Sequence, residues 1–205
     1  MDYEEYKISR DLAWKIILDM GFTELPIKVS AICRKLGIQV RSYEKAKKLL
    51  KRHQLEHKTL EIDGFTLGID GRYTILFNEH CSIQRNRFTV AHELGHILLG
   101  HVPKDGIHIT AINREPSSKD NPLEQQANVF ASRLMAPLCV LKSLRINDAK
   151  DIARLCDISE TAAQFRFNRL KLINEREQHK SCYGLSPLEM EVLEQFRPYI
   201  ESHML

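Results

Sequence analysis

The sequence lacks any long apolar run and any strong excess of charge of one sign. No stretch of the 205 residues approaches the roughly 18 apolar residues that cross a bilayer, which excludes a membrane-spanning helix. The 30 Lys and Arg residues face 27 Asp and Glu residues, and the net charge of +3 creates no strong field for nucleic acid or membrane. Acidic residues (Asp2, Glu4 and Glu5) occupy the N-terminus, where a signal peptide would be basic. With 43% hydrophobic residues, the composition is that of a globular protein rather than a disordered chain.

Cysteines are few and show no pairing pattern. They are odd in number, widely spread and contain no CxxC motif: Cys33, Cys81, Cys139, Cys156 and Cys182. This excludes a disulfide framework and a cysteine-based zinc site. We therefore expect a reduced protein of the cytoplasm.

Hydrophobic periodicity predicts a mainly helical chain with a few strands. Helical spacing occurs in residues 4–20, 26–36, 88–99, 122–135, 138–144, 149–155 and 162–173, and Ser186-Pro187-Leu188-Glu189 opens a last helix with a capping-box pattern. Alternation predicts strands near residues 38–43, 62–69 and 72–78, and Asp70-Gly71 is the pair that a tight hairpin turn prefers. The basic stretch from Lys45 to Lys58 is typical of a solvated helix face or a linker.

These elements predict an α+β fold, in which the hairpin joins the first strand in a small three-stranded, antiparallel-type sheet. We expect three segments along the chain. A core covers residues 1–145, a helical unit covers residues 146–178, and a C-terminal tail with one helix covers residues 179–205.

The strongest chemical signal is His92-Glu93-Leu94-Gly95-His96. Residues four apart lie on one face of a helix, so the two imidazoles can reach one metal ion. The glutamate after the first histidine then lies beside a metal-bound water and can accept its proton. The alternative interpretation is a pair of partly exposed histidines on a surface helix.

A catalytic zinc site needs a third protein ligand, and the spacing leaves its identity open. The extended pattern HExxHxxGxxH fails, because Leu99 and Val102 occupy its Gly and His positions. A glutamate on a second helix is the favoured substitute, with Glu124 as the candidate; the same residue, three positions after Asn121, could instead be a capping-box glutamate. The spacing also allows four other ligands: Glu115, Asp120, His101 and His108.

Two motifs in order resemble the ImmA/IrrE family of zinc metallopeptidases. Residues 87–96 read RFTVAHELGH and residues 124–137 read EQQANVFASRLMAP, close to the family patterns RFTxAHELGHxLL and ExxANxFAxxLLMP. The resemblance covers about residues 10–175 and includes the hairpin and the segment from Pro26 to Val40. Two departures occur: Gly100 stands where the family often has a histidine, with His101 one residue later, and Ala136 is inserted before the last proline.

The resemblance implies a zincin-like metallopeptidase core that holds one Zn²⁺ per chain, with Mn²⁺ or Co²⁺ as alternatives. The metal ligands would be His92, His96 and Glu124, with Glu93 as the general base. Asn128 would orient a ligating histidine by accepting its second N–H. The sequence does not identify a residue that stabilises the oxyanion. His101 and Tyr73 are the candidates, and a structural role is the favoured interpretation of each.

The resemblance also implies a narrow substrate. This would be a helix-turn-helix repressor, whose cleavage derepresses a mobile element or a stress regulon. By analogy with other proteins that capture peptides, the substrate could lie along an edge strand of the hairpin. The alternative function is a non-catalytic regulatory protein that sequesters a repressor and carries a structural zinc site; Glu93 argues against it, because a structural site needs no general base.

Residues 148–176 look like a helix-turn-helix unit, with a serine at the start of the second helix. Sequence-specific DNA binding would require several polar side chains at the N-terminal end of that helix. The residues there, from Glu160 to Gln164, include an acidic side chain and several small ones. We therefore expect packing or partner docking rather than direct DNA binding. The sequence does not indicate the oligomeric state.

Overall fold

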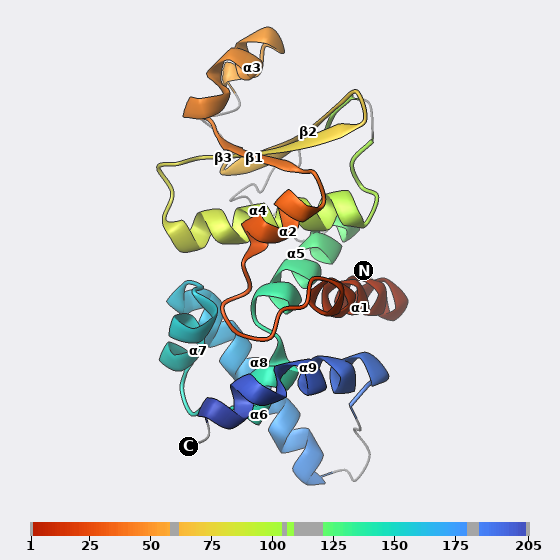
Figure 1. Ribbon diagram of the computed structural model, residues 1–205, viewed down its shortest axis with the longest axis vertical. Helices are drawn as coiled ribbons and strands as arrows, with labels where there is room; N and C mark the ends of the chain where they lie inside the picture. Colours follow the sequence, from red (N-terminus) through yellow and green to blue (C-terminus); the bar gives the residue numbers. More distant parts are fainter. Residues whose placement is uncertain (1, 58–61, 104–105, 109–120, 180–184, 204–205) are drawn as a thin grey trace. The chain divides into compact units, whose positions relative to one another are not determined.

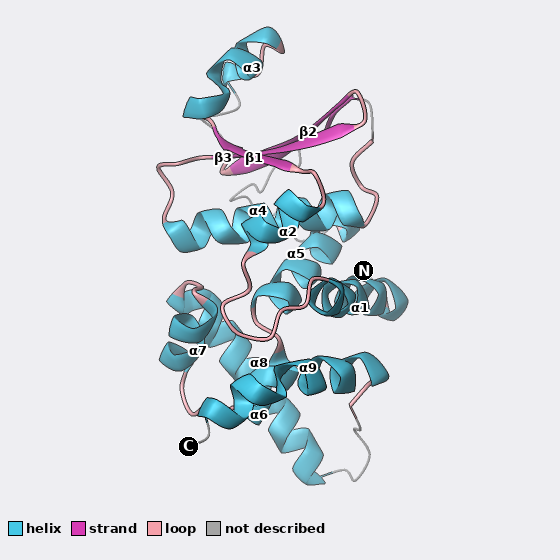
Figure 2. Cartoon of the chain, viewed as in Figure 1, coloured by secondary structure: helices cyan, strands magenta, loops and turns pink. Residues whose placement is uncertain are grey.

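The computed structural model of the chain describes residues 2–57, 62–103, 106–108, 121–179 and 185–203 (Figure 1). The chain divides into two compact units, one of Met1–Ser9 with Lys28–Ala131 and one of Arg10–Ile27 with Ser132–Leu205. All the described strands belong to the first unit, and the second is helical (Figure 2). The segment boundaries expected at residues 145 and 178 stay a prediction.

The α+β class and the mainly helical content are confirmed. The first unit contains α2 (Val29–Lys35), β1 (Gln39–Ser42), η1 (Glu44–Ala46), α3 (Lys47–Arg52), β2 (Gly64–Ile69), β3 (Arg72–Phe77), α4 (Ile83–Leu98), β4 (Gly106–His108) and most of α5 (Pro122–Met135). The second contains most of α1 (Tyr3–Asp19) and all of α6 (Leu138–Ser143), α7 (Ala149–Cys156), α8 (Glu160–His179) and α9 (Pro187–His203).

The sheet differs from the expected three-stranded, antiparallel type. Its described part has four strands in the order β1-β3-β2-β4. β1 runs parallel to β3, whereas the pairs β2–β3 and β2–β4 are antiparallel, so the sheet is mixed. η1 and α3 connect the end of β1 to the start of β2 at one end of the sheet, where Ser42 and Gly64 both pair with Phe77. β3 returns between β1 and β2, so it runs antiparallel to β2 and parallel to β1. β4 was not expected at all, since its three residues are too short to show alternation.

The hairpin is confirmed in position and in turn chemistry. Asp70 and Gly71 join β2 to β3 with φ values of 50° and 70°, the left-handed conformation that this two-residue turn requires. Both strands of the hairpin are internal, because β1 flanks β3 and β4 flanks β2. The premise that a strand of the hairpin forms an edge of the sheet is therefore wrong, because the described edges belong to β1 and β4. Where a substrate binds stays a prediction.

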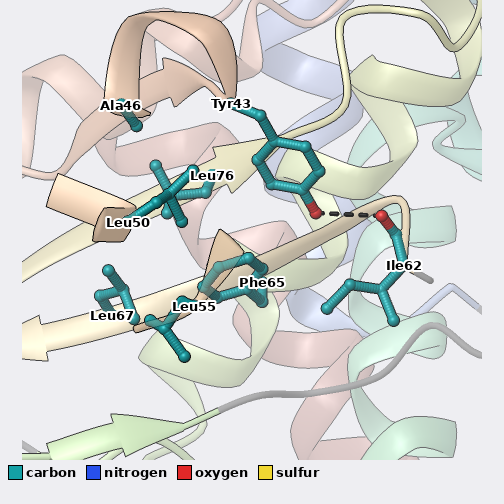
Figure 3. Close-up of a cluster of buried hydrophobic side chains, with 8 residues drawn as sticks. All are labelled: Tyr43, Ala46, Leu50, Leu55, Ile62, Phe65, Leu67 and Leu76. Atoms are coloured by element: carbon teal, nitrogen blue, oxygen red, sulfur yellow. Dashed lines mark hydrogen bonds between the residues drawn. The ribbon is translucent and has the colours of Figure 1, made fainter. Parts of the chain in front are cut away.

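The two faces of β2 have different neighbours. Phe65 and Leu67 point into a buried apolar cluster with η1, α3 and the segment before β2 (Figure 3). In this cluster the Tyr43 hydroxyl donates a hydrogen bond of 3.0 Å to the carbonyl oxygen of Ile62. The alternate residues Gly64 and Thr66 face α4, where a Cβ on Gly64 would collide with Cγ2 of Thr89. Small residues on this face let β2 approach α4 closely.

Several helix boundaries differ from the expected ones. α4 begins at Ile83, five residues before the apolar periodicity, because the Ser82 hydroxyl accepts the amide N–H of Arg85 and caps the helix. The basic stretch forms η1, α3 and the turns that follow, which agrees with a solvated helix face. α8 extends to His179, beyond the predicted end at residue 173. The loop expected between Gly100 and Ser118 lies largely outside the described residues.

The second unit shows the expected helix starts. The Ser186 amide donates to the Glu189 carboxylate while the Glu189 amide donates to the Ser186 hydroxyl, which is the reciprocal pattern of a capping box. A left-handed residue, Asp157, ends α7, and the Ser159 hydroxyl accepts the Ala162 amide N–H at the start of α8. These features fit the expected helix, turn and helix, and the helix-turn-helix interpretation itself stays a prediction.

Within the described residues, no helix combines the length and the apolar character that crossing a bilayer would require. No disulfide joins the four described cysteines, Cys33, Cys81, Cys139 and Cys156. Cys182 lies outside the described residues.

Candidate metal centre

Helix α4 carries both histidines and the intervening glutamate into the interior of the first unit. His92 is 1% exposed, and Glu93 and His96 are fully buried. The ring centroids of His92 and His96 lie 4.6 Å apart, as expected for imidazoles one turn apart on the same helix face. This burial excludes the alternative of two partly exposed histidines on a surface helix.

Glu124, near the start of α5, meets the histidine pair. One carboxylate oxygen lies 3.1 Å from Nε2 of His92, and the other lies 3.4 Å from Nε2 of His96. The two Nε2 atoms are themselves 3.0 Å apart. Among the described residues, these three form the one group of His, Cys, Asp and Glu side chains whose donor atoms could hold a single metal ion.

The Glu124 carboxylate does not cap α5, which was the alternative role for this residue. The cap of α5 is the Asn121 side-chain oxygen, which accepts the amide N–H of Leu123, while Glu124 contacts the histidines. Glu115 and Asp120 lie outside the described residues, as does the side chain of His108. His101 is close by, but its Nδ1 faces Nδ1 of His96 rather than the Nε2 side.

The environment of Glu124 favours its charged form. Burial alone would raise its pKa, but hydrogen bonds from His92 and His96 and the nearby positive charge that these rings can carry outweigh burial. The pKa therefore falls from 4.5 to about 2. A carboxylate that stays ionised at neutral pH, together with two imidazole nitrogens, is a donor set for a divalent cation.

Gly95 lets α5 come close enough for this contact. A Cβ at this position would lie 2.9 Å from Cδ1 of Phe130 and 3.3 Å from both Cα and the carbonyl oxygen of Ala127. Real side chains do not tolerate the first distance, so the glycine between the two histidines allows the close approach of the two helices. Glu124 lies three residues before Ala127 on α5, and its position depends on this packing.

Each histidine has a polar partner at Nδ1, the ring nitrogen that points away from Glu124. Nδ1 of His92 lies 3.0 Å from Oδ1 of Asn128, which is one turn after Glu124 on α5. This is the contact that the resemblance implied for Asn128. Nδ1 of His96 lies 3.0 Å from Nδ1 of His101, whose Nε2 lies 3.1 Å from Oε1 of Gln126.

Glu93 is held by the sheet. The Thr66 hydroxyl, fully buried on β2, donates a hydrogen bond of 2.7 Å to Oε2 of Glu93. Because Thr66 shares its strand face with Gly64, the hydroxyl lies near enough to α4 to reach the carboxylate. A hydroxyl donor at this distance fixes the position of one oxygen of the carboxylate.

Tyr73 is tied to a different part of the unit. Its hydroxyl donates to the carbonyl oxygen of Val102 at 3.2 Å, which links β3 to the segment after α4. This contact is structural, and the oxyanion role expected for Tyr73 and His101 stays a prediction.

Sequence reasoning missed Thr66, Gln126 and the packing role of Gly95. Thr66 left a weak signal, as the polar residue between Phe65 and Leu67 in an alternating strand, which puts it on the opposite face from the apolar cluster. Gln126 left none, because a glutamine on an amphipathic helix is ordinary. Gly95 lies inside the recognised motif, but the motif alone does not say which helix packs on it.

Comparison with known families gives one match. Residues 33–168, about two thirds of the chain, match the model of peptidase family M78, described as the IrrE N-terminal-like domain. The matched range contains every residue of the centre, from Thr66 on β2 to Asn128 on α5. Among curated proteins, none matches the chain significantly.

Proposed function

The chain belongs to the peptidase family defined by the IrrE N-terminal-like domain, and on this premise we propose that it is a zinc-dependent endopeptidase that cleaves a helix-turn-helix repressor. The observation that carries the catalytic part is the buried convergence of His92, His96 and Glu124, with Glu93 on the same helix. The repressor substrate is supported by the likeness to the ImmA/IrrE family. Cleavage would take place in the cytoplasm, where such a repressor acts.

The donor set fits zinc in chemistry and in spacing. Ligand bonds of about 2.0–2.1 Å in a tetrahedral site put neighbouring donor atoms about 3.3 Å apart. The three separations here are 3.0, 3.1 and 3.4 Å. Two imidazole nitrogens and one carboxylate also match the ligand class of catalytic zinc, and three protein ligands leave the open position that catalysis requires.

When bound, Zn²⁺ would lower the pKa of a coordinated water to about 7 and polarise the scissile carbonyl. The chain's own residues supply the rest. The Glu93 carboxylate accepts the proton of the attacking water and passes it to the leaving amine. Thr66 holds that carboxylate through Oε2, and Asn128 keeps a hydrogen on Nδ1 of His92, which leaves Nε2 as the donor atom.

The decisive experiment separates cleavage from binding. Glu93→Gln keeps the size of the side chain and removes the base, so this variant should retain one Zn²⁺ per chain and bind the repressor. It should cleave the repressor at least roughly 100-fold more slowly, the scale of general-base catalysis. The assay uses a purified helix-turn-helix repressor as substrate, and cleavage is followed by mass spectrometry. Glu56→Gln, at an exposed position, serves as the matched control.

Two outcomes would contradict the proposal. Wild-type rates for Glu93→Gln would exclude Glu93 as the base. Full derepression in cells by Glu93→Gln, with no cleaved repressor detectable even for the wild type, would favour the alternative of a protein that sequesters the repressor.

A further inference from the structure

His101 is brought to His96 by the way α4 ends. Gly100 has a φ of 76°, its amide donates to the carbonyl of Ile97, and the amide of His101 donates to the carbonyl of His96. These two bonds form a Schellman motif, in which the second residue after the C-cap Leu99 is bonded back to the residue five positions earlier. His101 therefore lies against His96, with ring centroids 5.1 Å apart in an edge-to-face arrangement.

The same motif explains why the histidine follows the glycine here. The position after the last helical turn must be left-handed, which glycine adopts without strain and histidine does not. A histidine at position 100 would have to adopt that φ, whereas position 101 is free of the requirement. With glycine at position 100 and histidine at position 101, the motif places an imidazole beside the centre.

The hydrogen bonds around His101 can run in only one direction if Nε2 of His96 is to bind a cation. The Gln126 amide oxygen can only accept, so Nε2 of His101 carries the hydrogen. A neutral imidazole then accepts at Nδ1, so Nδ1 of His96 carries the next hydrogen and donates it. This leaves the lone pair of His96 on Nε2, the nitrogen that faces His92 and Glu124.

The opposite direction would close the site. If Gln126 donated through its amide nitrogen, His101 would carry its hydrogen on Nδ1 and His96 would carry its hydrogen on Nε2. A protonated Nε2 cannot donate a lone pair to a cation. With the Gln126 oxygen facing His101, as here, Nε2 of His96 is left without a hydrogen, although Gln126 does not contact that nitrogen.

We propose that Gln126 and His101 form a relay that selects the tautomer and fixes the ring orientation of His96 for metal binding. The proposal rests on the metal site of the proposed function and not on its substrate. His92 has the one-step equivalent in Asn128, so α5 supplies an oxygen acceptor for each histidine. In this relay both are positioning residues, because they act on the metal through His96.

The test measures metal affinity and not cleavage. Zn²⁺ affinity is determined on the full chain by competition with a chelator, and the visible spectrum of the Co²⁺-loaded protein reports the geometry of the ligands. Gln126→Leu removes the acceptor, and His101→Phe keeps the ring without its nitrogens. Each should weaken Zn²⁺ binding by about 10- to 100-fold, the range for losing an outer partner of a metal ligand, and should change the Co²⁺ spectrum.

Three further variants distinguish a relay from general packing. Gln126→Glu keeps an oxygen acceptor and should restore affinity close to that of the wild type. Gln125→Leu, a matched change at the neighbouring position of α5, should leave affinity unchanged. The double variant His101→Phe with Gln126→Leu should bind no more weakly than His101→Phe alone, because a relay broken at one link has nothing more to lose.

The proposal is overturned if both single variants keep wild-type affinity, if their losses add in the double variant, or if Gln125→Leu weakens binding as much as Gln126→Leu. Thermal unfolding of the metal-free variants checks that each one folds. Failure of the relay would leave repressor cleavage by the wild-type protein intact. If the proposed function fails instead, the wild-type protein cleaves no repressor, while the variants still show the expected losses of Zn²⁺ affinity.

Discussion

Gly95→Ala tests whether the close packing of α4 and α5 builds the metal centre. The added Cβ would lie 2.9 Å from Cδ1 of Phe130 and 3.3 Å from the Ala127 backbone. Carbon atoms normally approach to about 3.5 Å, so the side chain needs about 0.6 Å of relief at the ring and about 0.2 Å at the backbone. Phe130 is fully buried, and the backbone contact can be relieved only by moving α5.

The free energy of unfolding is a poor readout for this variant. Alanine is favoured over glycine in a helix by about 1 kcal/mol, and overpacking costs about 1–3 kcal/mol, so the two effects partly cancel. Metal affinity is the sharper measure, because ligand distances in metal sites hold to about 0.2 Å. The relief of about 0.2 Å needed at the Ala127 backbone already equals that tolerance at Glu124, and the relief of about 0.6 Å needed at the Phe130 ring exceeds it.

We expect Gly95→Ala to weaken Zn²⁺ binding by at least about 10-fold in a chelator competition assay, with a folded metal-free protein. Ile83→Ala, an exposed change on the first turn of α4, should leave the affinity unchanged. Unchanged affinity in Gly95→Ala would refute the argument that this glycine sets the distance between the two helices.

Two other predictions concern Glu93 and Glu124. Thr66→Val removes the hydroxyl that donates to Glu93, so kcat for repressor cleavage should fall about 10-fold while Zn²⁺ affinity and KM stay unchanged. Thr66→Ser keeps a hydroxyl and should recover the rate, and an equal loss of rate in both variants would contradict the role of the hydrogen bond. For Glu124, the pKa of about 2 in the folded protein lies below the ordinary value of 4.5, so its contribution to stability is fully present above about pH 4.5 and is lost as the pH falls towards 2. That contribution is on the order of 3 kcal/mol, because the pKa falls from 4.5 to about 2 and each pKa unit corresponds to about 1.4 kcal/mol. Urea unfolding of the metal-free wild type and Glu124→Gln should show a difference in stability that shrinks below about pH 4.5, and a difference that does not change with pH would contradict the lowered pKa.

Local sequence rules predicted the parts of the centre that lie within a few residues of one another. His92 and His96 share a helix face because they are four residues apart, and the tight turn at Asp70-Gly71 follows from two residues that tolerate positive φ. The same rules failed where a cap rather than periodicity decided the boundary, as at Ser82 before α4. They also failed for the sheet, since nothing in β1 itself indicates that its partner strand runs parallel.

The amino-acid sequence by itself determined which side chains could hold a metal, and left open which of them meet. Spacing allowed five third ligands and two roles for Glu124, and only the resemblance to a family narrowed the choice. Tertiary structure brought Glu124 to His92 across 32 residues, Thr66 to Glu93 across 27 and Gln126 to His101 across 25. Helix and turn geometry repeats over three or four residues, whereas these contacts depend on how closely α4 approaches β2 and α5. That distance is set by packing at Gly64 and Gly95, where a missing Cβ shows its effect only against the neighbouring element.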